Sequence, residues 1–170
     1  MTTSVELHAY LLALQTGTLS EREIYHSIHE FGREHFLDAR EVVEHHLYHA
    51  DPQFRYVALD VVGKHWHLVE HWHTAVRFLI HDIDADCRRM GASVLGSLMR
   101  DTQDMQTLHI LATIVANAYE NTYVRQTAYS AMRQIVHYDV QEQWAMSRGS
   151  YDLQRDADWE WVATFLSYSS

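Results

Sequence analysis

Apolar residues recur along this chain with the spacing of an amphipathic helix. In residues 51–63, for example, Phe54, Val57, Val61 and Val62 follow one another at short intervals of up to four residues. This spacing places the four side chains on one face of a helix with 3.6 residues per turn. The pattern therefore predicts an all-α protein built from helices with one buried face, and no strands.

Three segments carry this pattern in the same register, which indicates an internal repeat. Each segment opens with a residue type that caps helix N-termini, followed four residues later by an arginine. The opening residues are Asp51, Asp84 and Asn121, and the arginines are Arg55, Arg88 and Arg125. The arginines stand 33 and 37 residues apart, which is the length of a helix-pair repeat. A small residue follows each arginine, at Ala58, Gly91 and Ala128, where a neighbouring helix could approach closely.

The remaining segments complete a chain of about ten helices in a single domain, 1–170. A helix of a second type precedes each repeated segment, over 39–48, 69–81 and 105–119. Ser20 and Glu23 form a capping-box pattern that opens a helix through Phe31, and 5–14 is apolar enough for another helix. Short helices are expected at 140–146 and 159–168. We divide the domain into N-terminal helices in 1–33, three helix pairs in 34–137, and capping helices in 138–170.

The repeated pattern resembles the second helix of a HEAT repeat, which reads roughly as an aspartate turn, then Val-Arg, Ala and Leu-Gly. The match covers 51–63 and 84–96 well, whereas the third copy has Asn121 for the aspartate and Arg133 for the glycine. The resemblance is to small bacterial HEAT-repeat proteins, including the phycobilin-lyase-like type. It implies a right-handed α-solenoid of antiparallel helix pairs, in which the capping residue and the arginine brace adjacent repeats.

Composition and charge narrow the classes of partner. With 47% apolar residues, one proline and six glycines, the chain can bury a core and has no long flexible linker. Its formal charge of −10 disfavours nucleic acid and anionic membranes as partners. No cleavable leader and no membrane-length apolar window appear, so we expect a cytoplasmic protein. Cys87 is the only cysteine and is expected to be a buried core residue.

The fourteen histidines suggest a metal site as one hypothesis. Histidines and glutamates recur at helical spacing in two places, at Glu41, His45 and His49 and at His67 and His71. Deoxyhypusine hydroxylase, a HEAT-repeat enzyme, binds two irons through repeated His-Glu dipeptides, and this chain has one such dipeptide, His29-Glu30. Because the dipeptide is not repeated symmetrically, we expect no metal and no other cofactor. A metal-dependent di-iron hydroxylase-like enzyme remains the alternative function.

We expect no catalytic residues, because no nucleophile elbow, P-loop, dinucleotide glycine fingerprint or H-E-x-x-H motif is present. In HEAT stacks the second helices line the concave side. The outward positions there are Tyr56, Asp60, Lys64, Arg89, Ser93, Ser97, Gln126, Ser130 and Gln134, with Tyr129 nearby as a second aromatic anchor beside Tyr56. We therefore expect a non-enzymatic scaffold or adaptor that binds a protein with a basic patch. Adaptor, chaperone and toxin-immunity roles remain open.

Overall fold

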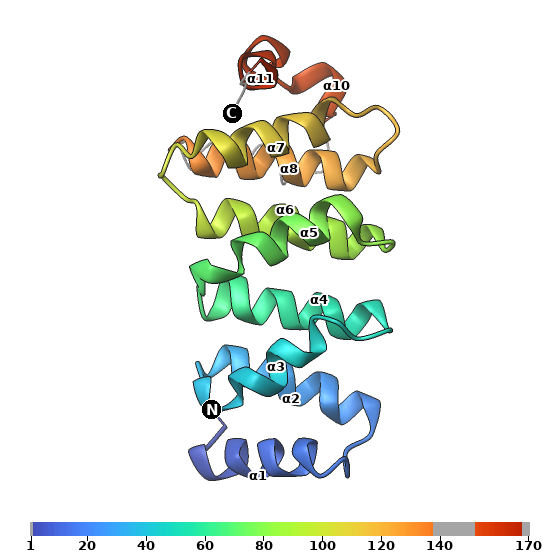
Figure 1. The fold of residues 1–170 in the computed structure, drawn as a ribbon, viewed down its shortest axis with the longest axis vertical. Helices are drawn as coiled ribbons and strands as arrows, with labels where there is room; N and C mark the ends of the chain where they lie inside the picture. Colours follow the sequence, from blue (N-terminus) through green and yellow to red (C-terminus); the bar gives the residue numbers. More distant parts are fainter. Residues whose placement is uncertain (1, 138–151, 168–170) are drawn as a thin grey trace. The chain divides into compact units, whose positions relative to one another are not determined.

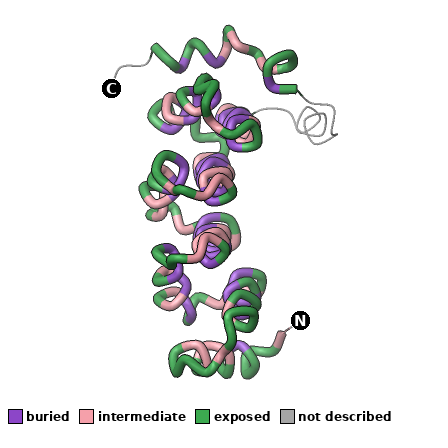
Figure 2. The backbone as a smooth tube through the Cα atoms, turned by 90° about the vertical axis from the view of Figure 1, so that its right-hand side faces the viewer, coloured by how far each residue is buried: buried purple, intermediate pink, exposed green. Residues whose placement is uncertain are grey.

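The computed structural model describes residues 2–137 and 152–167, and these residues form ten α-helices and no strand (Figure 1). They fall into two compact units, 1–73 and 74–170, and each unit is described by itself. Figure 2 shows that buried positions lie within the helices, whereas most connecting turns are exposed. In the described part of the chain, no helix combines the length and apolarity needed to cross a bilayer. The helix expected at 140–146 lies outside the described residues.

The first unit contains four α-helices, which are α1 (Ser4–Gln15), α2 (Glu21–Arg33), α3 (Arg40–His46) and α4 (Pro52–Asp60). A capping box at Ser20 and Glu23 starts α2, as the sequence predicted. The side chain of Asp51 accepts a hydrogen bond from the Gln53 amide at 2.8 Å and caps α4, so the first of the predicted caps is confirmed. Short 3₁₀ turns at Leu37–Ala39 and Val69–His71 complete the unit.

Helix α4 does not continue as a regular helix to Gly63, because it widens into a π-helix, η2 (Val61–His65). The Trp66 amide donates to the Val61 carbonyl at 2.8 Å, five residues back, and a positive φ of 53° at His67 ends the turn. Trp66 is buried and its Nε1 donates to the Phe31 carbonyl of α2 at 3.2 Å. The π turn thus holds a buried tryptophan against α2.

The second unit begins within α5 (Trp72–His81) and continues through α6 (Ala85–Leu98), α7 (Met105–Ala116) and α8 (Thr122–Ile135). Two shorter helices, α10 (Leu153–Asp156) and α11 (Trp159–Leu166), follow, and α10 was not predicted from the sequence. Asp84 and Asn121 cap α6 and α8, as expected. Helix α7 ends at Ala116 rather than at 119, because Asn117 leaves the helical conformation at φ −71° and ψ 101°.

Small residues let the helices of the second unit approach closely. A Cβ atom placed on Gly91 would lie 2.7 Å from both the Ala75 carbonyl oxygen and the Leu79 nitrogen of α5. A Cβ atom on Gly96 would lie 2.8 Å from the Ala131 Cα of α8. Both distances are shorter than a real Cβ atom tolerates. Helix α6 therefore needs glycine at position 91, where it meets α5, and at position 96, where it meets α8. The expectation of a close approach at Gly91 is confirmed.

Arg55 and Arg88 make the same backbone contacts in the two units. The Arg55 guanidinium donates to the carbonyls of His49 and Ala50, six and five residues earlier. Arg88 donates to the carbonyls of Asp82 and Ile83, at the same two offsets. Arg125 differs, because its Nε donates to the Val115 carbonyl of α7 at 2.9 Å. These arginines therefore hold the turns or helices that precede their own helices.

Candidate functional site

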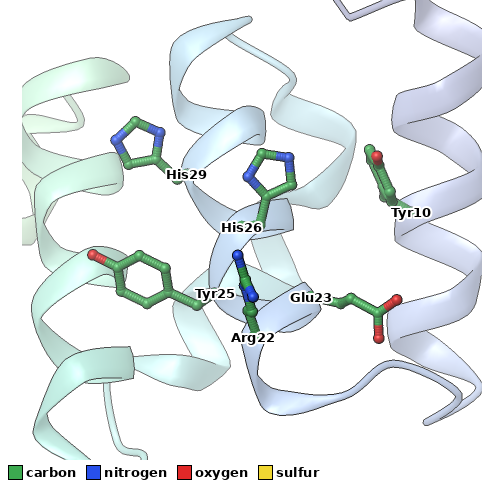
Figure 3. A pocket seen from close by; sticks show the side chains of 6 residues that line it. All are labelled: Tyr10, Arg22, Glu23, Tyr25, His26 and His29. Carbon is green, nitrogen blue, oxygen red and sulfur yellow. The ribbon is translucent and has the colours of Figure 1, made fainter.

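The first unit contains a surface pocket of about 500 Å³ between α1 and α2, which we name the α1–α2 pocket (Figure 3). Tyr10 of α1 lines one side. The residues contributed by α2 are Arg22, Glu23, Tyr25, His26 and His29. The site is thus built from one cation, one carboxylate, two phenols and two imidazoles.

Helix α2 presents these side chains because its opposite face is buried. Ile28 and Phe31 have no exposed surface. Arg22, His26 and His29 lie four and three residues apart, so they share one face of the helix. This spacing could be recognised in the sequence, but it lies outside the repeated segments, so the repeat pattern does not point to it as a site.

Most polar groups of the α1–α2 pocket are not engaged by the protein. Among the described residues, no hydrogen bond or ion pair involves the side chain of Tyr10, Arg22, Tyr25, His26 or His29. The rings of Tyr10 and His26 meet edge to face, with centroids 6.3 Å apart. The guanidinium, imidazole and phenol groups of the pocket are therefore available to a ligand.

Glu23, the one carboxylate in the pocket, is held by the cap of its own helix. One of its oxygens accepts hydrogen bonds from the Ser20 hydroxyl at 2.5 Å and from the Ser20 amide at 2.8 Å. These bonds lower the pKa of the Glu23 carboxyl below its ordinary value. Glu23 is thus an ionised capping residue at neutral pH, and its position is set by Ser20.

Glu30 lies on the same helix but is buried, with its charge compensated locally. Its carboxylate accepts a hydrogen bond from the Thr2 hydroxyl at 2.6 Å and pairs with Arg33. Burial raises the pKa of the Glu30 carboxyl, but the Thr2 bond and the Arg33 charge outweigh burial and bring the pKa below its ordinary value. Smaller contributions from His26 and His29 act in the same direction.

A second surface pocket, of about 570 Å³, lies between α1 and α3, and we name it the α1–α3 pocket. Its lining residues are Leu14, Gln15, Glu41, Val42, Glu44, His45, His46 and Tyr48. Glu44 accepts hydrogen bonds from Arg40 at 2.6 Å and His71 at 2.9 Å. Burial raises the pKa of the Glu44 carboxyl, but the His71 and Arg40 bonds outweigh it, so the pKa lies below its ordinary value. Glu44, one of the two acids that line this pocket, is therefore already paired.

The histidines are concentrated in the first unit, which holds eleven of the fourteen. The two spacings that suggested a metal face are not realised as helical faces. Helix α3 ends at His46, so His49 lies in the following turn and stacks on His46 with ring centroids 5.8 Å apart. His67 has a positive φ outside any helix, whereas His71 pairs with Glu44. Within 2–137 and 152–167, no three histidine, cysteine or acidic side chains form a group that could hold a metal ion.

The positions expected to form a binding groove divide between the two units. In the first unit, Asp60 already pairs with Lys64 at 3.1 Å and lies 3.6 Å from His65. In the second unit, α6 and α8 carry the other positions, and Arg100, in the turn after α6, donates to Gln134 of α8 at 3.1 Å. Arg89 pairs with Asp86 on its own helix at 3.1 Å. Tyr56 is half-buried.

The expectation of an exposed aromatic anchor at Tyr129 is wrong. Only 3% of Tyr129 is exposed, because α10 packs on α8 and Trp161 of α11 lies against the Tyr129 ring. Its hydroxyl accepts a hydrogen bond from the Asp158 amide at 3.0 Å, and its ring meets Trp161 edge to face at 5.8 Å. Tyr129 therefore attaches the C-terminal helices to α8 and is not available to a partner.

No protein-family model matches this chain, and no curated protein sequence matches it either.

Proposed function

We propose that this protein is a non-enzymatic helical-repeat scaffold, similar to HEAT repeats, that binds a protein partner. The repeat is supported by the arginine contacts described above. Arg55 and Arg88, in separate units, each donate hydrogen bonds to the carbonyls five and six residues before them. It is also supported by the matching caps at Asp51 and Asp84. On this proposal, each repeat is a helix pair whose turn is held by its own arginine.

One observation supports a partner surface on α6 and α8. Ser93 and Ser97 of α6, with Gln126 and Ser130 of α8, are half-buried. Among the described residues, none of these four side chains makes a hydrogen bond. Short hydroxyl and amide groups that are partly shielded yet unpaired can bond to a partner without first breaking bonds within the protein. We name these four residues the α6–α8 face.

The proposed partner carries a basic patch. The chain has 23 acidic side chains against 13 lysines and arginines. Its negative charge therefore attracts a basic surface at distances up to about the Debye length. The α6–α8 face itself is uncharged and would supply hydrogen bonds at short range. Partner affinity should therefore decrease as the salt concentration rises.

The test is affinity capture from host lysate with the wild type and two variants. Ser97→Arg with Ser130→Arg places bulky cations on the α6–α8 face, and Gln106→Arg places one on the exposed part of α7 as the matched control. Recovery of the same partner by the wild type and the control, with about tenfold less by the double variant, would support the proposal. Equal recovery by all three proteins would show that the partner binds elsewhere, and no reproducible partner would count against a scaffold.

A further inference from the structure

We infer that the α1–α2 pocket binds a small organic phosphate, with the phosphate held by Arg22, His26 and His29 and the organic body lying against Tyr10 and Tyr25. This site is separate from the α6–α8 face and does not rest on the proposed scaffold function. It follows from which groups line the pocket, which of them are already engaged, and how much room they enclose.

The available donors of the pocket suit an anion. Arg22 carries a permanent positive charge with five N–H donors, and each imidazole supplies at least one N–H at any pH. Charged donors form shorter and stronger hydrogen bonds to anionic oxygens than neutral donors do. None of the three side chains has a competing hydrogen bond or ion pair within the described residues. The pocket therefore offers three uncommitted donor groups on one face of α2.

The carboxylates near the pocket do not cancel this preference. Glu23 is turned into the capping box with Ser20, and Glu30 is buried with Thr2 and Arg33. On the neighbouring η2 segment, His65 approaches the His29 ring at 6.0 Å and faces Asp60, which is paired with Lys64. The strongly acidic character of the whole chain is thus not reproduced at the available groups of this pocket.

The number of donors favours phosphate over carboxylate. A carboxylate has two oxygens, and the fork of a single arginine can satisfy both. A phosphate monoester has three terminal oxygens and a charge of about −1.5 to −2 near neutral pH, so it can use a guanidinium and two imidazoles together. The arrangement of one arginine and two histidines therefore matches the larger anion.

The size and walls of the pocket indicate an organic ligand rather than inorganic phosphate. A volume of about 500 Å³ is within the range of small-molecule sites and much larger than a single phosphate ion needs. Figure 3 shows Tyr10 and Tyr25 on opposite sides of Arg22 and His26. Phenol rings in these places offer flat apolar walls with a hydroxyl at the tip. A planar organic group attached to the phosphate could contact either ring.

The experiment is isothermal titration calorimetry of the full chain at low ionic strength, with phenyl phosphate, inorganic phosphate and benzoate as the probes. We expect phenyl phosphate to bind at least tenfold more tightly than either of the others. Inorganic phosphate binding as tightly would overturn the assignment of an organic ligand, and benzoate binding as tightly would overturn the assignment of phosphate. Failure of phenyl phosphate to bind at millimolar concentration would overturn the site itself.

Variants of the lining residues test whether phenyl phosphate binds in the α1–α2 pocket. Arg22→Gln, and His26→Gln with His29→Gln, should each weaken phenyl phosphate binding at least tenfold. His45→Gln, an exposed histidine of the α1–α3 pocket, is the matched control and should bind as the wild type does. Because the altered side chains are exposed, melting temperatures should be unchanged, and this separates a lost ligand contact from a lost fold. Equal affinity in all four proteins would contradict the inference.

Discussion

Arg88 and Glu120 form a two-pronged ion pair across 32 residues of sequence, with N–O distances of 3.0 and 2.9 Å. The same guanidinium holds the carbonyls of Asp82 and Ile83, so one side chain connects the turn before α6 to the turn before α8. Burial raises the pKa of the Glu120 carboxyl, but the bonds from Arg88 and the Asn121 amide outweigh it, and the pKa lies below its ordinary value. Arg88 is therefore placed to hold both turns at neutral pH.

Replacing Glu120 with glutamine should destabilise the protein at neutral pH by about 1–3 kcal/mol, because the pair of charge-assisted hydrogen bonds from Arg88 is lost. A lowered folded-state pKa stabilises the fold above the unfolded value of roughly 4.3, and this stability is lost as the pH falls through the folded pKa. The difference between wild type and Glu120→Gln should thus shrink below about pH 4. Denaturant unfolding at pH 7 and pH 3 measures this difference in the free energy of unfolding, with exposed Glu160→Gln as the control. A constant difference across this range would contradict the assignment.

Gly91→Leu should destabilise the second unit by about 1–3 kcal/mol through overpacking, because a Cβ already meets the α5 backbone. Gly91→Ala should also destabilise, although alanine in a helix interior ordinarily gains about 1 kcal/mol over glycine. Thermal unfolding compares both with Ser93→Ala on the same helix, which should change stability by less than about 0.5 kcal/mol. A Gly91→Ala variant more stable than the wild type would show that α6 can move away from α5.

Mild acid should destabilise the first unit through His46, which is buried. Burial lowers the pKa of the His46 imidazole, and the neighbouring His49 and His45 lower it further, although a bond to the Val42 carbonyl opposes them. A histidine with a lowered folded pKa stabilises the fold above the unfolded value of roughly 6.5 and loses that contribution as the pH falls toward the folded pKa. His46→Leu should remove part of the stability loss between pH 7 and 5. Unfolding midpoints at pH 7 and pH 5 measure this loss, and exposed His73→Leu, at a histidine that does not affect the His46 pKa, should retain all of it.

Tyr129→Phe should weaken the attachment of α10 and α11 by about 0.5–1.5 kcal/mol, because the Asp158 amide loses its acceptor. Hydrogen exchange in 159–166 is the measurement, since local opening of these helices should increase while exchange in α6 stays the same. Tyr123→Phe, at an exposed tyrosine of the same helix, is the control. Unchanged protection in Tyr129→Phe would mean that the remaining contacts hold the segment, namely the Trp161 ring contact and the packing of α11 on α7, which includes the bond from His109 to the Phe165 carbonyl.

Local signals in the sequence predicted most helices and their beginnings. The caps at Ser20, Asp51, Asp84 and Asn121 could be recognised because each satisfies amides only two or three residues away. The close approach at Gly91 could be anticipated because the small residue recurs at one position of the repeat. These features depend on a few adjacent residues, and such patterns are visible in one sequence.

Features that depend on contacts between distant segments could not be predicted. The π turn at Val61–His65 follows from the fit of Trp66 against α2, which the helical period does not encode. The burial of Tyr129 depends on α10 and α11, the first of which is only four residues long. The α1–α2 pocket required Tyr10 of one helix to meet Arg22 and His26 of the next. In each case the missing information was which segments pack together.

The uneven placement of histidines gives the two units different electrostatic responses to acid. Residues 1–73 contain eleven acidic side chains, five lysines and arginines, and eleven histidines, so full histidine protonation changes their formal charge from −6 to +5. Residues 74–170 contain only three histidines and change from −4 to −1. Near neutrality both units repel other anions, whereas in mild acid they carry opposite signs. Copies of this chain should then attract one another, and light scattering at low ionic strength should rise as the pH approaches 5.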